Sequence, residues 1–293
     1  MHIDAFEDAI MNCRFCFMCR HLSTIGNVRC TEVDTPRVRA AMLYGLRTGT
    51  NSFDDEDFID ALYRCELSAC CRRNCVNGYD ENGLALAARA DVVEAGKAPA
   101  AVQKLAKKYA SNAEWKAEGK GDVAWFLDET TAADKAVVAA AKKLFAAAYD
   151  ALTKDYPEMG VKLQPKVLCF SGFLVQAKVA FKKAAGEVYY LADDFMRNYD
   201  HCECPEKLLK ALKADNRPFG TNDEESYCCG EGAVVLDKLN PALVKALAEY
   251  VAARADHPKT DRIVVLSAYT KKVLAKYGKL HVETMEELAA SCL

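Results

Sequence analysis

The stretch NCRFCFMCRHLSTIGNVRC, residues 12–30, decides how the first third of the chain folds. Its cysteines follow the pattern Cys13-x2-Cys16-x2-Cys19. This is the spacing with which thiolates wrap an iron–sulfur cube, because each two-residue gap lets the chain turn from one iron to the next. The stretch therefore predicts a segment that folds around a metal cluster.

A near copy of this pattern lies in YRCELSACCRRNC, residues 63–75. It aligns as Cys65-x2-Ser68-x2-Cys71-x3-Cys75, with a serine in place of one thiol. Two near-complete copies of one motif indicate a pair of metal sites more strongly than a single copy would. Structural zinc is the weaker alternative, because Cys-x2-Cys-x2-Cys crowds a tetrahedral ion.

Each copy lacks one thiol of the bacterial ferredoxin run. Ser23 stands where the first run needs its fourth cysteine, and the next thiol along the chain is Cys30. Ser68 is the gap in the second run, with Cys70 as an extra thiol beside it. Cys30 and Cys70 are therefore the candidates to replace the missing ligands.

In ferredoxins with two clusters, the fourth cysteine of each run binds the other cluster. Two ligand sets follow from this exchange, one complete and one that depends on replacements. The first set is Cys13, Cys16, Cys19 and Cys75, and the second is Cys65, Cys70, Cys71 and Cys30. The second set could also hold a three-iron cluster or use a serine ligand.

The composition of the chain indicates its expected compartment and excludes some classes of partner. The N-terminus MHIDAFEDAI is acidic rather than basic and apolar, so it predicts no secretory signal, and a cytoplasmic protein is expected. In a reducing compartment the 14 cysteines favour metal binding over disulfides. The net charge of −3 gives no nucleic-acid footprint, and no apolar run is long enough to predict a membrane span.

Every basic residue in the first ninety is arginine. Arginine offers a rigid fork of donors that could bind cluster sulfurs or an acidic partner. The same arginines could instead form salt bridges with the acidic residues of that segment. The sequence leaves both interpretations open.

Helical patterns dominate the first part of the chain. Caps, Pro and Gly positions and apolar stripes predict helices over 34–49, 54–65 and 82–96. We expect a small α-helical domain that holds the two cysteine motifs over residues 1–96, then a helix and linker over 97–120.

The remainder alternates between apolar runs and helical patterns. Strands are predicted at 122–128, 165–174, 187–192, 261–268 and 279–284. Helices are predicted at 131–156, 175–186, 205–214, 240–255, 269–278 and 285–292. Alternation of this kind indicates βαβ units. The fold class is therefore α+β overall, with residues 121–293 forming an α/β domain that contains a parallel sheet.

Three segments carry a family resemblance: CRFCFMCRH…DTPRVRAAML, LYRCELSACCRRNC and ESYCCGEGA. Together they resemble the iron–sulfur subunits that pair with flavin-linked glycolate or lactate oxidase-type proteins. These subunits are relatives of the heterodisulfide reductase electron-transfer and Cys-Cys-Gly (CCG) subunits. The resemblance implies that residues 1–96 form an α-helical ferredoxin domain with two [4Fe–4S] clusters. It also implies a hetero-oligomer with an FAD-linked oxidoreductase subunit, with FAD only on that partner.

The C-terminal half departs from the family pattern. Cys228, Cys229 and Gly230 match the CCG turn, but Ser267 and Thr270 stand where a later Cys-x2-Cys is expected. The other half of the domain has no CCG at all. The resemblance therefore implies a CCG-like domain with two degenerate halves.

Two further thiols could still complete a third site. Cys202 and Cys204, with His201 beside them, could join Cys228 and Cys229 around another cluster or a zinc ion. The alternative is a relic, in which the glycines serve a tight turn and the thiols are inert.

The sequence shows no catalytic triad and no nucleotide-binding loop, so we expect a redox subunit without catalysis of its own. The leading hypothesis is an electron-transfer subunit that relays electrons between a partner flavoprotein and another acceptor. A second is a CCG-type reductase of a disulfide or small acceptor, with its cluster at Cys228 and Cys229. A third is an assembly module in which metal only holds the fold.

Overall fold

A computed structural model describes residues 1–13, 15–73, 75–110, 125, 128–155, 169–192, 194, 203–220, 226–233 and 235–293. The chain divides into two compact units. Unit 1 comprises Met1–Trp115, Asp194–Asp200 and Asn222–Ala253. Unit 2 comprises Lys116–Asp193, His201–Thr221 and Arg254–Leu293. The segment that carries the CCG turn therefore belongs to the same unit as the N-terminal cysteine motifs.

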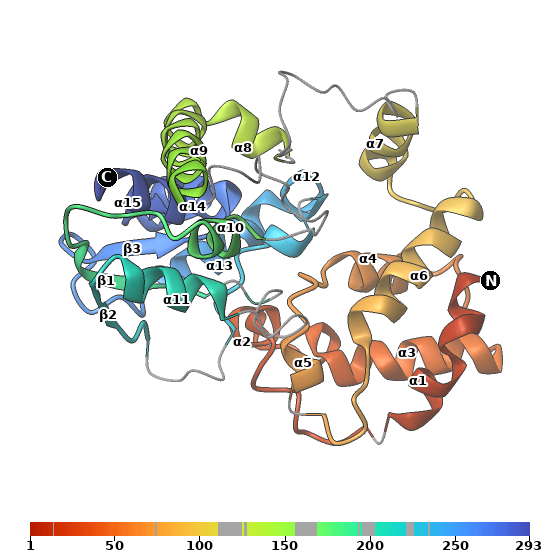
Figure 1. Ribbon diagram of the computed structural model, residues 1–293. Coiled ribbons are helices and arrows are strands. Elements are labelled where there is room, and N and C mark those ends of the chain that lie inside the picture. The colour runs from red at the N-terminus through yellow and green to blue at the C-terminus, as the bar shows by residue number, and fades with distance from the viewer. Residues whose placement is uncertain are drawn as a thin grey trace. The chain divides into compact units, whose positions relative to one another are not determined.

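The regular elements described in unit 1 are all helices, joined by turns and loops (Figure 1). Its 3-10 helices are η1 (His2–Phe6), η2 (Glu32–Asp34) and η4 (Glu231–Ala233). Its α-helices are α1 (Glu7–Asn12), α2 (Thr24–Arg29), α3 (Pro36–Thr48), α4 (Glu56–Tyr63), α5 (Cys70–Arg73), α6 (Glu81–Glu94), α7 (Ala100–Ala110), α12 (Val235–Leu239) and α13 (Pro241–Ala252). The three helices predicted in the first ninety-six residues are confirmed as α3, α4 and α6.

Local capping chemistry explains where these helices begin. Asp55 accepts a hydrogen bond from the backbone N–H of Phe58 at the start of α4. Pro36 occupies the first turn of α3, where its missing N–H costs nothing. At the other end of α3, Gly49 has a φ of 78°, the left-handed conformation that glycine adopts without strain.

One apolar core joins the helices of unit 1. Ile3 and Ile10 from η1 and α1 pack with Leu43, Phe58 and Leu84 from α3, α4 and α6. All five side chains are fully or almost fully buried. This packing fixes the end of α1, where Cys13 follows directly.

Unit 2 contains a four-stranded sheet in which every pair of neighbours is parallel. The strands are β1 (Gly186–Tyr190), β2 (Ala214–Arg217), β3 (Arg262–Val265) and β4 (His281–Thr284), in the order β2-β1-β3-β4. The register pairs Val188 with Asn216 and Val264 with Tyr190. Crossover helices connect β1 to β2 and β3 to β4, as parallel strands require.

The helices of unit 2 are α8 (Glu129–Ala133), α9 (Lys135–Asp155), α10 (Phe170–Gln176), α11 (Cys204–Ala211), α14 (Ala268–Val273) and α15 (Met285–Ser291), with a π-helical turn η5 (Leu274–Gly278). Figure 1 shows α9, α14 and α15 gathered on one side of the sheet. Leu144, Leu174, Val188, Leu208 and Leu288 contribute to one buried core between these helices and the strands.

The α+β class with a parallel sheet is confirmed. Two expected elements are wrong. Helix α10 occupies the end of the strand predicted at 165–174, and of the helix predicted at 175–186 residues 177–185 are turns and loop. Short apolar runs do not separate a strand from a buried helix. Here Cys169 caps α10 through its sulfur, which accepts from the N–H of Gly172 at 3.2 Å. The strand predicted at 122–128 lies mostly outside the described residues.

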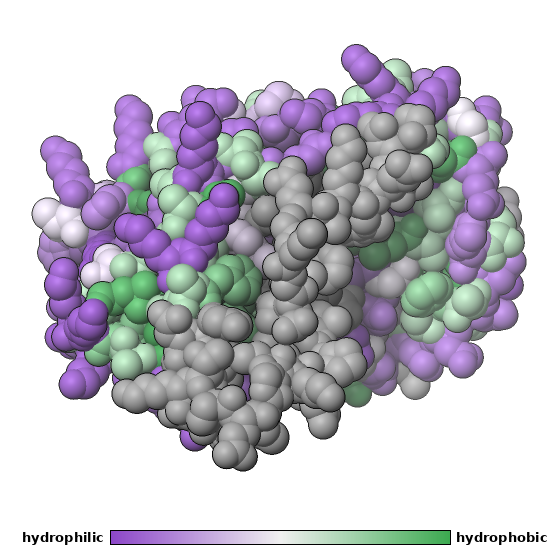
Figure 2. Space-filling view, turned by 45° about the horizontal axis from the view of Figure 1, so that its top comes forward, coloured by the Kyte–Doolittle hydropathy of each residue, from purple (hydrophilic) through white to green (hydrophobic). Residues whose placement is uncertain are grey.

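Hydrophilic side chains cover much of the described surface visible in Figure 2, with smaller apolar areas between them. Within the described part of the chain, no helix has both the length and the apolar character needed to cross a bilayer.

Candidate metal centres

Five cysteines from the two N-terminal motifs line one open pocket of unit 1. Four of them form the first predicted ligand set, namely Cys13, Cys16, Cys19 and Cys75. The pocket opens to solvent and has a cavity volume of about 30 Å³, and one water needs about 10–15 Å³, so there is room for a small group between the side chains. The other lining residues are Met18, Pro36, Arg37, Cys71, Val76, Asn77 and Tyr79. The fold thus brings together thiols that are far apart in the sequence.

Backbone turns and one cross-link position these thiols. Asn77 donates its side-chain N–H to the carbonyl of Asn12 at 2.6 Å, which ties the second motif to the first. The N–H of Gly78 bonds to the carbonyl of Cys75 at 3.0 Å, and Gly78 adopts a φ of 61°. Phe15, between Cys13 and Cys16, also lies in the left-handed region, with a φ of 50°. For a residue other than glycine this conformation is uncommon.

The pocket thiols are too far apart for one metal ion. Among the described residues, the only three potential ligand atoms that all lie within 4.8 Å of one another belong to His2, Asp91 and Glu94. A tetrahedral zinc ion with bonds of about 2.3 Å holds its sulfurs about 3.8 Å apart. No three of the pocket thiols are therefore as close together as a tetrahedral zinc ion would hold them.

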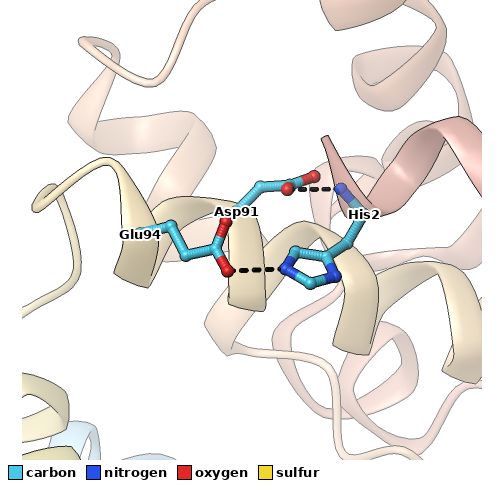
Figure 3. A group of neighbouring side chains, drawn as sticks. All are labelled: His2, Asp91 and Glu94. Atoms are coloured by element: carbon cyan, nitrogen blue, oxygen red, sulfur yellow. Dashed lines mark hydrogen bonds and ion pairs between the residues drawn. The ribbon is translucent and has the colours of Figure 1, made fainter.

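The His2, Asp91 and Glu94 group itself is a structural clasp (Figure 3). Both oxygens of Asp91 are already used, because they accept from the backbone N–H groups of His2 at 2.5 Å and Ile3 at 3.0 Å. The His2 ring bonds to Glu94 at 2.7 Å, and this bond raises the pKa of the imidazole. The clasp fixes η1 to α6 and so supports the helix that leads to Cys13.

Burial and neighbouring negative charges oppose ionisation of the pocket thiols. Burial, then the carboxylate of Glu81, raises the pKa of Cys19 to about 12. Burial also raises the pKa of Cys13, and the charges of Cys75 and Cys16 add to the shift. Thiolates gathered here would repel one another, so a cationic group is needed to hold them deprotonated together.

Glu81 lies between the pocket and a second group of thiols. One of its oxygens accepts from Arg39 Nε at 2.5 Å, and the other accepts from the Sγ–H of Cys71 at 2.8 Å. Cys71 is buried but also lines the pocket. Glu81 therefore contacts Arg39 through one oxygen and the pocket residue Cys71 through the other.

The second group consists of the buried thiols Cys65, Cys70 and Cys71. Ser68 Oγ donates to Cys70 Sγ at 3.0 Å, and Cys70 Sγ lies 3.0 Å from the carbonyl oxygen of Leu22. Ser68, one of the two serines that replace a ligand, thus contacts the extra thiol next to it. Burial raises the pKa of Cys65 to about 11.

Glu66, between these thiols, is a buried carboxyl group. Its Oε2 atom has no hydrogen-bond partner among the described residues, and its side chain is 98% buried, at a relative exposure of 2%. Burial raises its pKa to about 7. An unsatisfied buried oxygen of this kind is uncommon and calls for a missing ion or donor.

The segment that carries the CCG turn contacts residues of both cysteine motif regions, Thr24 and Glu66. Thr24 Oγ1 donates to the carbonyl of Ser226 at 3.0 Å, and Ser226 Oγ donates to Asp194 Oδ2 at 2.5 Å. Cys228 Sγ lies 4.0 Å from the carbonyl oxygen of Glu66. The second thiol of the turn is buried as well, but Cys229 Sγ contacts the carbonyl of Tyr227, at 3.7 Å.

Cys30 is placed elsewhere. It is the C-cap of α2, whereas Ser23 is the N-cap, so the length of the helix, about 10 Å, separates them. Its exposed thiol points at the carbonyl of Asn27, at 3.4 Å, in a different pocket that Tyr250 also lines. The structure does not bring Cys30 together with Cys65.

The third predicted site is divided. Cys204 belongs to unit 2 and Cys228 and Cys229 belong to unit 1, while His201 and Cys202 lie outside the described residues. Cys204 instead lies near Cys169. A Cβ built on Gly172 would be 3.1 Å from Cys204 Sγ and 3.3 Å from Cys169 Sγ.

Most arginines near the motifs form salt bridges. Arg64 Nε bonds to Asp34 at 2.5 Å, and Arg29 Nε bonds to the same carboxylate at 2.7 Å. Arg89 differs, because its guanidinium donates to the carbonyls of Leu62 and Cys65. The salt-bridge interpretation therefore holds for the first two arginines, and Arg89 adds positive charge beside Cys65.

Sequence reasoning missed Glu66, Glu81 and Asp194. The only available signal was that Glu66 lies inside the second cysteine motif, next to Cys65. Nothing in the sequence marks Asp194, because only the fold brings it to the CCG turn.

No family model, no curated protein and no solved structure matches the chain, so its function is argued from these residues and their geometry.

Proposed function

We propose that the chain is an iron–sulfur electron-transfer subunit whose first [4Fe–4S] cluster is held by Cys13, Cys16, Cys19 and Cys75. The observation that carries the proposal is that these four thiols, chosen from spacing alone, line one pocket. No three of these thiols lie as close together as a tetrahedral zinc ion would hold them, and the Cys-x2-Cys-x2-Cys spacing is that of an iron–sulfur cluster.

A bound cluster would supply one-electron redox chemistry, with a potential set by charge, hydrogen bonds and burial. The chain supplies the four thiolates and a partly apolar wall. Arg37, which lines the pocket, places its guanidinium 4.4 Å from the ring centre of Phe17. Glu81 and Arg39 add a buried charged pair between the two groups of thiols.

Access to the pocket suits exchange of electrons with another protein. Cys16 is exposed, and so are the apolar side chains of Phe17, Met18 and Val76 near the pocket. Electron-transfer encounters use small interfaces, so a limited apolar surface is sufficient. We propose an FAD-linked oxidoreductase subunit as the partner, on the strength of the resemblance in the cysteine motifs.

The test is anaerobic purification, iron and sulfide analysis, and low-temperature EPR before and after reduction. Two clusters would give about eight irons and eight sulfides per chain, with visible charge-transfer absorbance. Cys16→Ala should remove one reducible signal, because it deletes a ligand of the pocket cluster. Co-purification with an FAD protein would support the partner.

Cys30→Ala is the matched control. Both thiols are exposed and both come from the first cysteine segment, but Cys30 lies outside the pocket. The pocket signal should therefore survive in Cys30→Ala and disappear in Cys16→Ala. Colourless wild-type protein that contains zinc and no iron would overturn the proposal and favour the assembly module.

A further inference from the structure

The two thiols of the CCG turn have different neighbours. Cys228 Sγ lies 4.0 Å from the carbonyl oxygen of Glu66, which follows Cys65 in the second cysteine motif. Cys229 Sγ instead lies 3.7 Å from the carbonyl oxygen of Tyr227, within its own segment. One thiol of the CCG turn therefore lies against the second cysteine motif, and the other does not.

Close backbone packing holds the CCG turn in this position. A Cβ on Gly232 would be only 2.7 Å from the carbonyl oxygen of Glu66 and 2.9 Å from that of Leu67. Leu67 and Ala69 both adopt left-handed conformations, with φ of 57° and 58°. Strained residues of this kind persist only where the surroundings impose them, and they concentrate at functional sites.

Two further contacts flank Ser23, the position at which the first motif lacks its fourth cysteine. Cys70 Sγ lies against the carbonyl of Leu22, and Thr24 bonds to the CCG segment. Ser23 lies between these two contacts, at the position where a ferredoxin run has its fourth thiol. Cys228 therefore comes to the vicinity of this position, and Cys30 is at the other end of α2.

We infer that Cys228 of the CCG turn, and not Cys30, completes the second metal centre with Cys65, Cys70 and Cys71. The turn is then part of the electron-transfer centre rather than a separate site. Glu66 follows Cys65 in the chain, and its buried Oε2 atom has no hydrogen-bond partner among the described residues, which favours a group bound in this region. This inference rests on the proposed iron–sulfur function and refines its ligand set.

The experiment compares Cys228→Ala with Cys229→Ala in the full chain, purified anaerobically. Iron, sulfide and low-temperature EPR are measured for each. Cys228→Ala should lose the second signal, or convert it to that of a three-iron cluster, and keep the pocket signal. Cys229→Ala is the matched control, because its thiol is equally buried but contacts Tyr227. It should retain both signals.

Persistence of the pocket signal in Cys228→Ala shows that the variant has folded. If that signal is also lost, Cys228→Val gives the second measurement, because it fills the buried position without offering a ligand atom. Retention of both wild-type signals in Cys228→Ala or Cys228→Val overturns the inference. So does loss of the second signal in Cys30→Ala.

Failure of the proposed function gives a different result. Wild-type protein without iron would overturn both proposals. Wild-type protein with only the pocket cluster would leave the electron-transfer function in place and overturn the second centre.

Discussion

Arg39 and Glu81, from α3 and α6, form a buried ion pair with 2.5 Å between Nε and Oε1. Both side chains are almost fully buried. Arg39 also donates to the carbonyl of Asp34 at 2.8 Å, and Glu81 accepts from Cys71. The pair therefore joins the helical core to the thiols that line the pocket.

Arg39→Met should destabilise the cluster-free protein by about 3–5 kcal/mol, because it leaves the Glu81 charge buried and unpaired. The double variant Arg39→Met, Glu81→Met should recover much of this loss, since it removes both charges and keeps apolar volume. Urea unfolding of the reduced protein measures both. A double variant no more stable than Arg39→Met would show that the charge is not the cause.

Gly232→Ala should weaken the packing of the CCG turn on residues 66 and 67. The added methyl group meets two backbone carbonyls below 3.0 Å, and overpacking of this kind costs about 1–3 kcal/mol. The second EPR signal should weaken with it. Gly96→Ala is the control, because nothing lies within 4 Å of its Cβ position and only left-handed backbone strain is added. It should keep both signals.

Glu66 should make the cluster-free protein less stable as the pH rises. Its carboxyl has a pKa of about 7 when folded and a usual value of 4.5, so the folded state holds the proton more tightly. The stability it contributes is complete below pH 4.5 and is lost as the pH rises through 7. A shift of this size corresponds to about 3 kcal/mol.

Glu66→Gln should remove this part of the pH dependence and stabilise the reduced, cluster-free protein at pH 8. Unfolding in urea at pH 5 and pH 8 gives the comparison. Equal pH dependence in the wild type and the variant would show that Glu66 ionises freely in the folded chain.

Cys204→Ala should leave the iron and sulfide content unchanged. Its sulfur lies with that of Cys169 near Gly172 in unit 2, whereas the proposed ligands lie in unit 1. Iron analysis of the variant beside the wild type tests this expectation. Loss of iron would favour the third metal site and, with it, the catalytic reductase alternative.

Much of the architecture follows from local signals in the sequence. Pro36 and Gly49 mark the ends of α3, and Asp55 marks the start of α4. Strand β2 was missed because ADNR, its sequence, is polar and is held by pairing with β1 rather than by apolar burial. An edge strand of this kind has no periodicity to detect.

The pocket thiols could be grouped from spacing because the motif itself encodes their geometry. The second ligand set could not be grouped from spacing. Cys30 was the nearest remaining thiol in the sequence, but α2 is a rigid spacer that carries it away from Ser23. Cys228 became a candidate only when the fold placed residues 222–253 in unit 1.

Because residues 222–253 belong to unit 1, this unit cannot be completed until late in synthesis of the chain. Roughly 150 residues separate Cys71 from Cys228, and ribosomes add about 5–20 residues per second. On a nascent chain the thiols of α5 would wait on the order of ten seconds or more before the CCG turn emerges. A truncated product that ends near residue 120 would lack the CCG turn altogether.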